Sequence, residues 1–227
     1  MILYYVRHGL PNYEEDNLEE LGRYQADETS KFLATINFDM IFSSPLGRAK
    51  ETASYLEKRI NKTAIILPFA NESIAHHYFH LLNEETNERQ WLFFNPTWRT
   101  YLNELRDDPN WFDSKYFKEP RFKEATEYYS KEIDEWLTSI GIHHDKEENT
   151  YTKIEGKEVP NNIVLFAHGG FAYAFLSYIL GLSYPYFASH FICMNTCGVT
   201  EIIFDLDTKT ARLNRYNDVH YDREKLT

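Results

Sequence analysis

Two histidines and two arginines follow short apolar segments that lie far apart in the sequence. Arg7 and His8 come directly after the run Ile2–Val6, and His168 comes after a similar run late in the chain. Arg48 follows a third apolar run, at the start of a segment with helical spacing. Guanidinium groups are planar and permanently charged, and imidazole can act as a nucleophile or a proton carrier. Brought together, these four side chains would form a cationic cluster suited to binding a phosphate group.

The elements that must position these side chains are strands that alternate with helices. The spacing of apolar residues predicts strands over Ile2–Val6, Asp39–Ser43, Ala64–Pro68 and Asn162–Ala167, and helices over Leu18–Ile36, Leu46–Ile60, Phe122–Leu137 and Phe171–Leu180. Cys193–Phe204 and Thr210–Tyr216 predict an antiparallel pair near the C-terminus. Such alternation predicts a mostly parallel sheet, and ligand sites in open α/β sheets lie beyond the carboxyl ends of the strands.

The motifs resemble those of the histidine phosphatase superfamily, also called the phosphoglycerate mutase-like family. The matching segments are Arg7-His8-Gly9, Ser43-Ser44-Pro45-Leu46-Gly47-Arg48-Ala49-Lys50-Glu51-Thr52-Ala53 and His168-Gly169. They occur in the family's order, and the resemblance extends from Ile2 to about Asp205. It implies an α/β fold, a three-layer α/β/α sandwich with a mostly parallel mixed sheet and a helical cap. We expect a single domain over residues 1–227, with the cap at about 73–160.

The resemblance also implies an activity, that of a metal-independent phosphomonoester hydrolase acting through a phosphohistidine intermediate on a small phosphorylated metabolite. His8 would be the nucleophile and His168 would donate to the phosphate oxygens, while Arg7 and Arg48 would bind those oxygens. Glu72 matches the acid that protonates the leaving group in this family. No cofactor and no metal are expected, because the arginines and histidines would supply the positive charge that Mg²⁺ supplies elsewhere.

Two further residues are candidates for binding the substrate. Asn12 lies in the loop after Arg7-His8-Gly9 and could donate its amide to a phosphate oxygen, although an ordinary loop asparagine has no need of that role. Gly169, directly after His168, belongs to the same expected set. The sequence does not specify the substrate. The motifs determine how the phosphate group of the substrate is bound, but recognition of its alcohol group depends on the geometry of the cap, which a single sequence does not give.

Two other functions remain open. A phosphoglycerate mutase would use the same phosphohistidine, and the chain length between Glu72 and His168 is similar to that in mutases, but the basic segments that bind the mutase substrate are not recognisable here. A phosphate-binding regulatory module without activity is the third hypothesis. Retention of bisphosphoglycerate on the phosphoenzyme would separate the mutase from the hydrolase.

The segment after Glu72 is the least regular part of the pattern. His76, His77 and His80 lack the acids or cysteines of a typical metal cluster, so we interpret them as pocket or surface residues. From Glu84 to Ser139 the spacing indicates helices, interrupted by a loop over residues 107–120. Arginines in this segment could contact a second anionic group of the substrate or lie on helix surfaces; they are Arg89, Arg99, Arg106 and Arg121.

Composition limits the possible partners and locations. The 227 residues carry a formal net charge of −11, which argues against nucleic acid and anionic membranes as partners. No run approaches the ~20 apolar residues of a membrane span, and no signal peptide is recognisable, so we expect a cytoplasmic protein and allow for a homodimer. The two cysteines, Cys193 and Cys197, are expected to be buried thiols.

Overall fold

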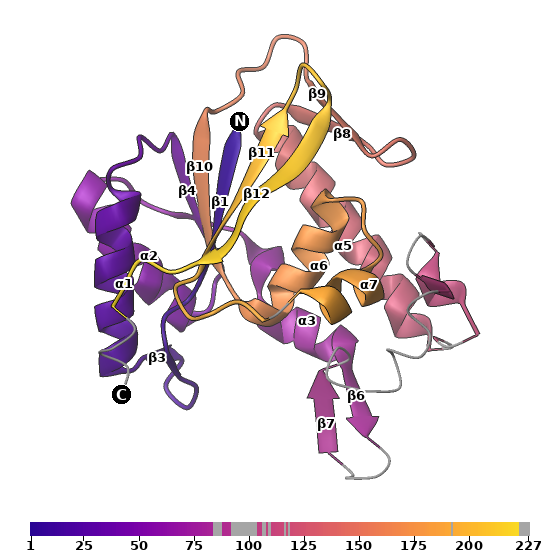
Figure 1. Ribbon diagram of the computed structural model, residues 1–227, viewed down its shortest axis with the longest axis horizontal. Helices are drawn as coiled ribbons and strands as arrows, with labels where there is room; N and C mark the ends of the chain where they lie inside the picture. The colour runs from indigo at the N-terminus through magenta and orange to yellow at the C-terminus, as the bar shows by residue number, and fades with distance from the viewer. Residues whose placement is uncertain are drawn as a thin grey trace.

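The computed structural model describes residues 1–83, 88–91, 104–105, 108, 110–115, 117, 119–191 and 193–222. Its centre is a six-stranded sheet in the order β12-β11-β1-β10-β4-β5 (Figure 1). The strands are β1 (Ile2–Arg7), β4 (Met40–Ser43), β5 (Ile65–Ile66), β10 (Asn162–Ala167), β11 (Val199–Asp205) and β12 (Thr210–Asp218). Strands β1, β10, β4 and β5 are parallel, and β11 and β12 join antiparallel to the β1 edge. The sheet is therefore mixed, as the resemblance implied.

Helices cover both faces of this sheet, so the chain forms the expected α/β/α sandwich. Helices α1 (Glu20–Leu33) and α2 (Gly47–Ile60) lie on one face, and α5 (Pro120–Ser139), α6 (Gly169–Ile179) and α7 (Tyr184–His190) lie on the other (Figure 1).

The alternation of side chains along β1 explains why both faces are covered. Leu3 and Tyr5 enter the core beneath α5 and α6, whereas Tyr4 and Val6 enter the core beneath α1 and α2. A strand with apolar residues on both sides must be buried on both sides.

The helix ends follow local signals that the sequence contains. Helix α2 ends at Asn61, which adopts a left-handed conformation with φ of 53° and donates its N–H to Glu57 O. Helix α6 ends before Gly181, which has φ of +65°, as predicted. A Cβ at Gly181 would lie 2.2 Å from Asn149 Nδ2, so both the backbone angle and the close contact favour glycine there.

The segment at 73–160, expected to hold a helical cap, contains hairpins as well as helices. Its described elements are α3 (Glu72–Phe79), β6 (His80–Asn83), β7 (Glu88–Trp91), a 3₁₀ turn at Trp111–Asp113, α5, β8 (Ile142–Asp145) and β9 (Thr150–Lys153). The helical prediction is wrong for Glu88–Trp91, which pairs with β6 in a hairpin where Trp91 lies opposite His80. The helices predicted over Trp91–Phe94 and Trp98–Leu105 lie outside the described residues, except for Trp91 in β7 and residues 104–105, which are helical.

Two smaller predictions need correction, and one small hairpin was not predicted. The strand expected over Ala64–Pro68 has only two paired residues, because Pro68 begins a 3₁₀ turn instead. Two short strands, β2 (Pro11–Asn12) and β3 (Asn17–Leu18), form a small hairpin before α1. Cys197 is buried as expected, but Cys193 is exposed.

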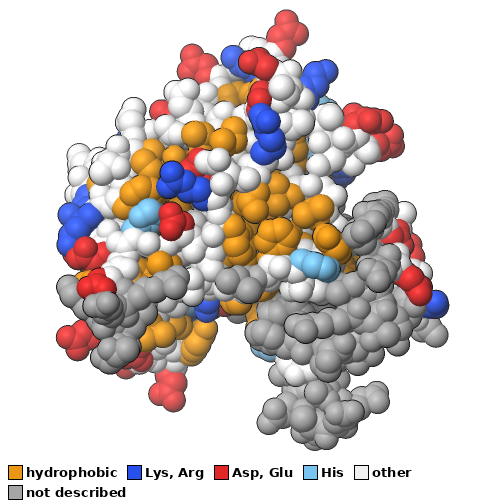
Figure 2. All heavy atoms as spheres, in the orientation of Figure 1, with side chains coloured by type: hydrophobic (Ala, Val, Ile, Leu, Met, Phe, Trp, Pro, Cys, Tyr) orange, Lys and Arg blue, Asp and Glu red, His pale blue; other side chains and the backbone are white. Residues whose placement is uncertain are grey.

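Charges of both signs are dispersed over the face shown in Figure 2. Among the described residues of that face, Lys and Arg side chains lie between Asp and Glu, and hydrophobic side chains gather over the region of α6 and α7. Within the described part of the chain, no helix is both long and apolar enough to cross a membrane.

Candidate active site

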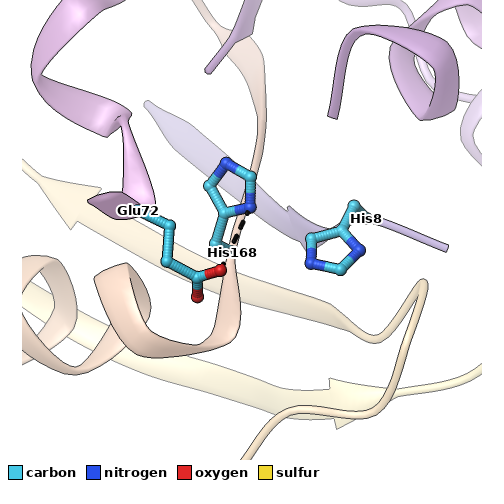
Figure 3. Close-up of side chains that lie close together, drawn as sticks. All are labelled: His8, Glu72 and His168. Carbon is cyan, nitrogen blue, oxygen red and sulfur yellow. Dashed lines mark ion pairs between the residues drawn. The ribbon is translucent and has the colours of Figure 1, made fainter. Parts of the chain in front are cut away.

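The parallel strands bring the catalytic candidates to one edge of the sheet. Arg7 of β1 pairs in register with Ala167 of β10, and Phe166 of β10 pairs with Ser43 of β4. The next residue along each strand is therefore at the same edge, and these residues are His8, His168 and Ser44. Arg48, in the first turn of α2, and Glu72, the first residue of α3, complete the cluster. Figure 3 shows His8, His168 and Glu72 converging from three elements.

His8 has a free nitrogen in a buried position. Its side chain is fully buried, and Nδ1 donates a hydrogen bond to Gly9 O at 2.7 Å, which leaves the lone pair on Nε2. Nε2 has no hydrogen-bond partner among the residues that the structure describes. Burial, together with the positive charge of Arg7, lowers the pKa of His8 to about 3. The imidazole is therefore neutral near pH 7, as a nucleophile must be.

His168 is held by two hydroxyl groups. Its Nε2 lies 2.7 Å from Ser44 Oγ, and Ser44 Oγ also accepts from Leu46 N at 3.3 Å. A hydrogen bond donated by the Ser44 hydroxyl to Nε2 would leave the imidazole proton on Nδ1, which faces the site and has no hydrogen-bond partner within the described part of the chain. The Tyr5 hydroxyl donates to His168 O at 2.7 Å and accepts from His168 N at 3.2 Å, which holds the backbone.

Arg48 lies between two carboxylates. Nη1 donates to Asp16 Oδ1 at 2.6 Å and Nη2 donates to Glu72 Oε2 at 3.0 Å. Asp16 also accepts from Gly47 N at 2.6 Å, at the start of α2. Burial opposes ionisation of Asp16, but the hydrogen bonds from Gly47 and Arg48 outweigh it and hold the pKa of Asp16 below its usual value. The guanidinium is thus positioned before any substrate arrives.

Glu72 links the two halves of the site. Its Oε1 accepts from Gly170 N at 2.8 Å, while Oε2 lies 3.7 Å from His168 Nδ1. Burial and the nearby positive charges hold the pKa of His168 well below its usual value, so His168 is neutral in this state. The 3.7 Å contact therefore joins a carboxylate to a neutral ring.

Arg7 reaches the site from the end of β1. Nη1 donates to Met194 O and lies 3.7 Å from Cys193 Sγ. The buried Nε has no hydrogen-bond partner among the described residues. A Cβ at Gly169 would lie 3.3 Å from Arg7 Nε and 3.1 Å from the Cys193 sulfur. Gly169 thus allows the guanidinium to approach the start of α6.

Arg7, Arg48 and Glu72 line a cavity of about 600 Å³, together with Gly169 and Gly170. Its walls beyond Arg7, Arg48, Glu72 and the two glycines are formed by Tyr13, Ser73, His76, His80, Trp91 and Cys193. The rings of His76 and His80 lie 3.4 Å apart at their centroids, and the ring of Trp91 meets that of His80 edge-on at 4.6 Å. Three aromatic side chains, inclined to one another, therefore form one wall of this cavity.

Asn12 and the arginines of the expected cap are placed less directly. Asn12 Oδ1 accepts from Glu14 N at 3.0 Å in the loop, and its neighbour Tyr13 lines the cavity. Arg121 donates to His80 O at 2.9 Å and pairs with Glu119, so it supports the wall. The other candidate arginines, Arg99 and Arg106, lie outside the described residues, as does the side chain of Arg89.

Sequence reasoning missed three residues of this arrangement. Ser44 stood within a recognised motif, but nothing in the motif indicated its bond to His168. Tyr5 has the pattern of an ordinary core residue. Asp16 lies in a polar loop 32 residues before Arg48, and no local signal points to their contact. Tertiary structure alone brings these pairs together.

The fold and this edge of the sheet define the class of protein. The chain belongs to the histidine phosphatase superfamily (branch 1), whose sequence profile matches residues 3–219. The superfamily assignment made from the motifs is therefore confirmed.

Solved structures add particular relatives of the same fold. Phosphoserine phosphatase of Entamoeba histolytica, in complex with 3-phosphoglyceric acid, is 21% identical with a TM-score of 0.57, covering 96% of this chain and 97% of its own. Mycobacterial glucosyl-3-phosphoglycerate phosphatase is 21% identical with a TM-score of 0.53, covering 95% and 98%. "Mycobacterial hydrolase 2" is 20% identical with a TM-score of 0.55, covering 99% and 94%. No curated protein matches the chain significantly.

Proposed function

We propose that this protein is a metal-independent phosphomonoester hydrolase that acts through a phosphohistidine at His8 on a small phosphorylated metabolite. The observation that carries the proposal is the buried, unpartnered Nε2 of His8, whose ring is neutral and lies beside Arg7 and Arg48. Membership of the histidine phosphatase superfamily supports it. So do the names of the structural relatives, two of which are phosphatases.

In the first step, His8 Nε2 attacks phosphorus and the bond from phosphorus to the alcohol oxygen breaks. Arg7 and Arg48 would bind the phosphoryl oxygens, and His168 would donate its Nδ1 proton to one of them as charge develops. The departing oxygen takes a proton from Glu72, which must carry that proton when the alcohol leaves. The products of this step are the alcohol and phospho-His8.

In the second step, water attacks the phosphorus of phospho-His8 and the phosphorus–nitrogen bond breaks. Glu72, now ionised, accepts the proton of the attacking water, and its position beside Gly170 N and Arg48 suits that state. Inorganic phosphate is released and His8 returns to its neutral form. Glu72 is thus proposed as acid in one step and base in the other.

The test is phosphate release from p-nitrophenyl phosphate and a panel of phosphomonoesters with chelator present. The panel includes phosphoserine and glucosyl-3-phosphoglycerate, because the related structures carry those substrate names. We expect chelator-resistant turnover, reduced at least ~1,000-fold in His8→Ala, since loss of a nucleophile has costs of this order or greater. His143→Ala is the matched control, because His143 is exposed on β8.

A trapping experiment tests the intermediate itself. Substrate labelled in the phosphate group should leave acid-labile, alkali-stable label on the wild type and on His143→Ala, and none on His8→Ala. Turnover that survives His8→Ala, or that disappears with chelator, contradicts the mechanism. Bisphosphoglycerate retained on a labelled enzyme that releases no phosphate would point to the mutase instead.

A further inference from the structure

The free nitrogens of the two catalytic histidines and the carboxylate of Glu72 converge on one point (Figure 3). One nitrogen from His8, one from His168 and one oxygen from Glu72 all lie within 4.8 Å of one another. The remaining ring nitrogens are already hydrogen-bonded, to Gly9 O and Ser44 Oγ, so the converging atoms are His8 Nε2 and His168 Nδ1. Neither nitrogen has a hydrogen-bond partner in the described segments of the chain.

We propose that His8, His168 and Glu72 form a three-ligand site for Zn²⁺, and that an ion bound there inhibits the enzyme by occupying the nucleophile. Two imidazole nitrogens and one carboxylate are a donor set that zinc uses, with the fourth position open. Tetrahedral ligands at zinc distances are about 3.3 Å apart. The 3.7 Å between His168 Nδ1 and Glu72 Oε2 is close to this value, so small side-chain rotations would close the site.

The groups behind the histidines suit metal ligation. Zinc-bound histidines usually donate their second N–H to a fixed acceptor, which orients the ring. His8 Nδ1 already donates to Gly9 O at 2.7 Å. For His168 to offer Nδ1 as a lone pair, its proton must move to Nε2, and Ser44 Oγ at 2.7 Å can accept it because a hydroxyl both donates and accepts.

The nearby charges do not exclude a dication. Arg7 and Arg48 contribute two positive charges, and Asp16 and Glu72 contribute two negative charges. Asp16 and Glu72 both pair with Arg48, at 2.6 and 3.0 Å, so much of its charge is compensated locally. The four charges cancel in sum while both histidines are neutral. Zinc would therefore meet a site without net positive charge, although Arg7 remains nearby.

Direct binding tests the site without any need for turnover, so it stands whether or not the proposed hydrolase activity is found. Metal-stripped protein is titrated with Zn²⁺ in competition with a chromophoric zinc chelator. We expect one equivalent to bind to the wild type, and the affinity to fall more than about 10-fold in His8→Ala and in Glu72→Gln, because even an outer-shell change costs about 10- to 100-fold. Glu72→Gln keeps the size of the side chain, and circular dichroism checks that each variant folds.

Two controls separate this site from other donors. His143→Ala removes an exposed histidine and Cys193→Ser removes the thiol at the cavity mouth; both should bind zinc as the wild type does. Zinc affinity that depends on His76 but is unchanged in His8→Ala and Glu72→Gln would place the ion on the cavity wall and overturn the proposal. Absence of a one-equivalent site in the wild type would also overturn it. Where turnover is measured, zinc should inhibit it and chelator should restore it.

Discussion

At the scale of single residues, the site depends on which nitrogen of each histidine is free. Gly9 O accepts a hydrogen bond from the Nδ1–H group of His8, which leaves the lone pair on Nε2, facing the site. Ser44 Oγ has the matching role for His168, with the difference that a hydroxyl can serve either tautomer. A backbone carbonyl thus fixes the tautomer of His8, the proposed nucleophile, and a side-chain hydroxyl contacts the ring of His168.

Replacement of Ser44 tests the second of these contacts. Ser44→Ala should lower kcat about 10-fold with little change in KM, because His168 loses a hydrogen bond of about 1–1.5 kcal/mol that holds its proton on Nδ1. Ser44→Thr, which keeps the hydroxyl, should restore most of the rate. Steady-state kinetics on the best substrate of the panel gives both constants.

The control for this prediction is the adjacent serine. Ser43 is equally buried, but its hydroxyl bonds to Ser44 O at 3.0 Å and not to a catalytic group. Ser43→Ala should therefore leave kcat within about two-fold of the wild type. Equal losses in Ser43→Ala and Ser44→Ala would mean that packing, and not the tautomer of His168, explains the effect.

At the scale of elements, a loop and a helix are joined where Arg48 must be held. Asp16, in the turn between β2 and β3, bonds both Gly47 N at the start of α2 and the Arg48 guanidinium. The loop beside it also supplies Tyr13, whose ring lies 5.3 Å from the Arg48 guanidinium carbon. Loop and helix therefore form one wall of the site.

Loss of that junction should weaken substrate binding. We expect Asp16→Ala to reduce kcat/KM by about three- to ten-fold, mainly through KM, because Arg48 keeps its charge but loses one of its two anchors. Glu14→Ala, in the same loop and exposed, should leave kcat/KM unchanged. An Asp16→Ala enzyme with higher kcat/KM would show that Asp16 competes with the phosphate for Arg48.

At the scale of the whole molecule, a partly buried polar cluster ties α5 to the β8–β9 hairpin and to α6. Asp134 on α5 lies 2.9 Å from His144 Nδ1 and 2.9 Å from Lys146 Nζ, and it accepts from the Tyr178 hydroxyl at 2.8 Å. Burial opposes its ionisation, but the hydrogen bonds from His144, Lys146 and Tyr178 outweigh burial and hold the pKa of Asp134 below its usual value.

This shift makes part of the stability dependent on pH. A carboxyl group with a lowered folded-state pKa stabilises the fold above its unfolded pKa of about 3.9, and that contribution is lost as the pH falls through the folded value. Asp134→Asn should thus lower the melting temperature by about 3–10 °C at pH 6–7, and by progressively less below about pH 4.

Thermal melts of wild type and Asp134→Asn between pH 7 and pH 3 measure this difference in melting temperature. Glu135→Gln, at an exposed position on the same helix, should have the melting temperature of the wild type at every pH. A difference between Asp134→Asn and wild type that stays constant down to pH 3 would assign the effect to packing of the asparagine and not to the charge of Asp134.

The sequence by itself determined the strand ends and the motifs that follow them. The candidate site residues were identified because each lies beside a run of apolar residues or inside a short motif, and both are local properties of the sequence. These residues are Arg7, His8, Arg48, Glu72 and His168. The closure of α6 at Gly181 was predictable for the same reason. The helical interpretation of Glu84–Ser139 was wrong at Glu88–Trp91, because the spacing of apolar residues over so short a segment does not distinguish a helix from a hairpin strand.

Only the tertiary structure decided which side chains meet. The parallel register of β1, β10 and β4 places His8, His168 and Ser44 at one edge, and the folding of a polar loop against α2 brings Asp16 to Arg48. The exposure of Cys193 beside Arg7 and the aromatic wall of the cavity are also results of packing between distant segments. Contacts of this kind depend on the arrangement of elements in space, and a single sequence contains no local signal for them.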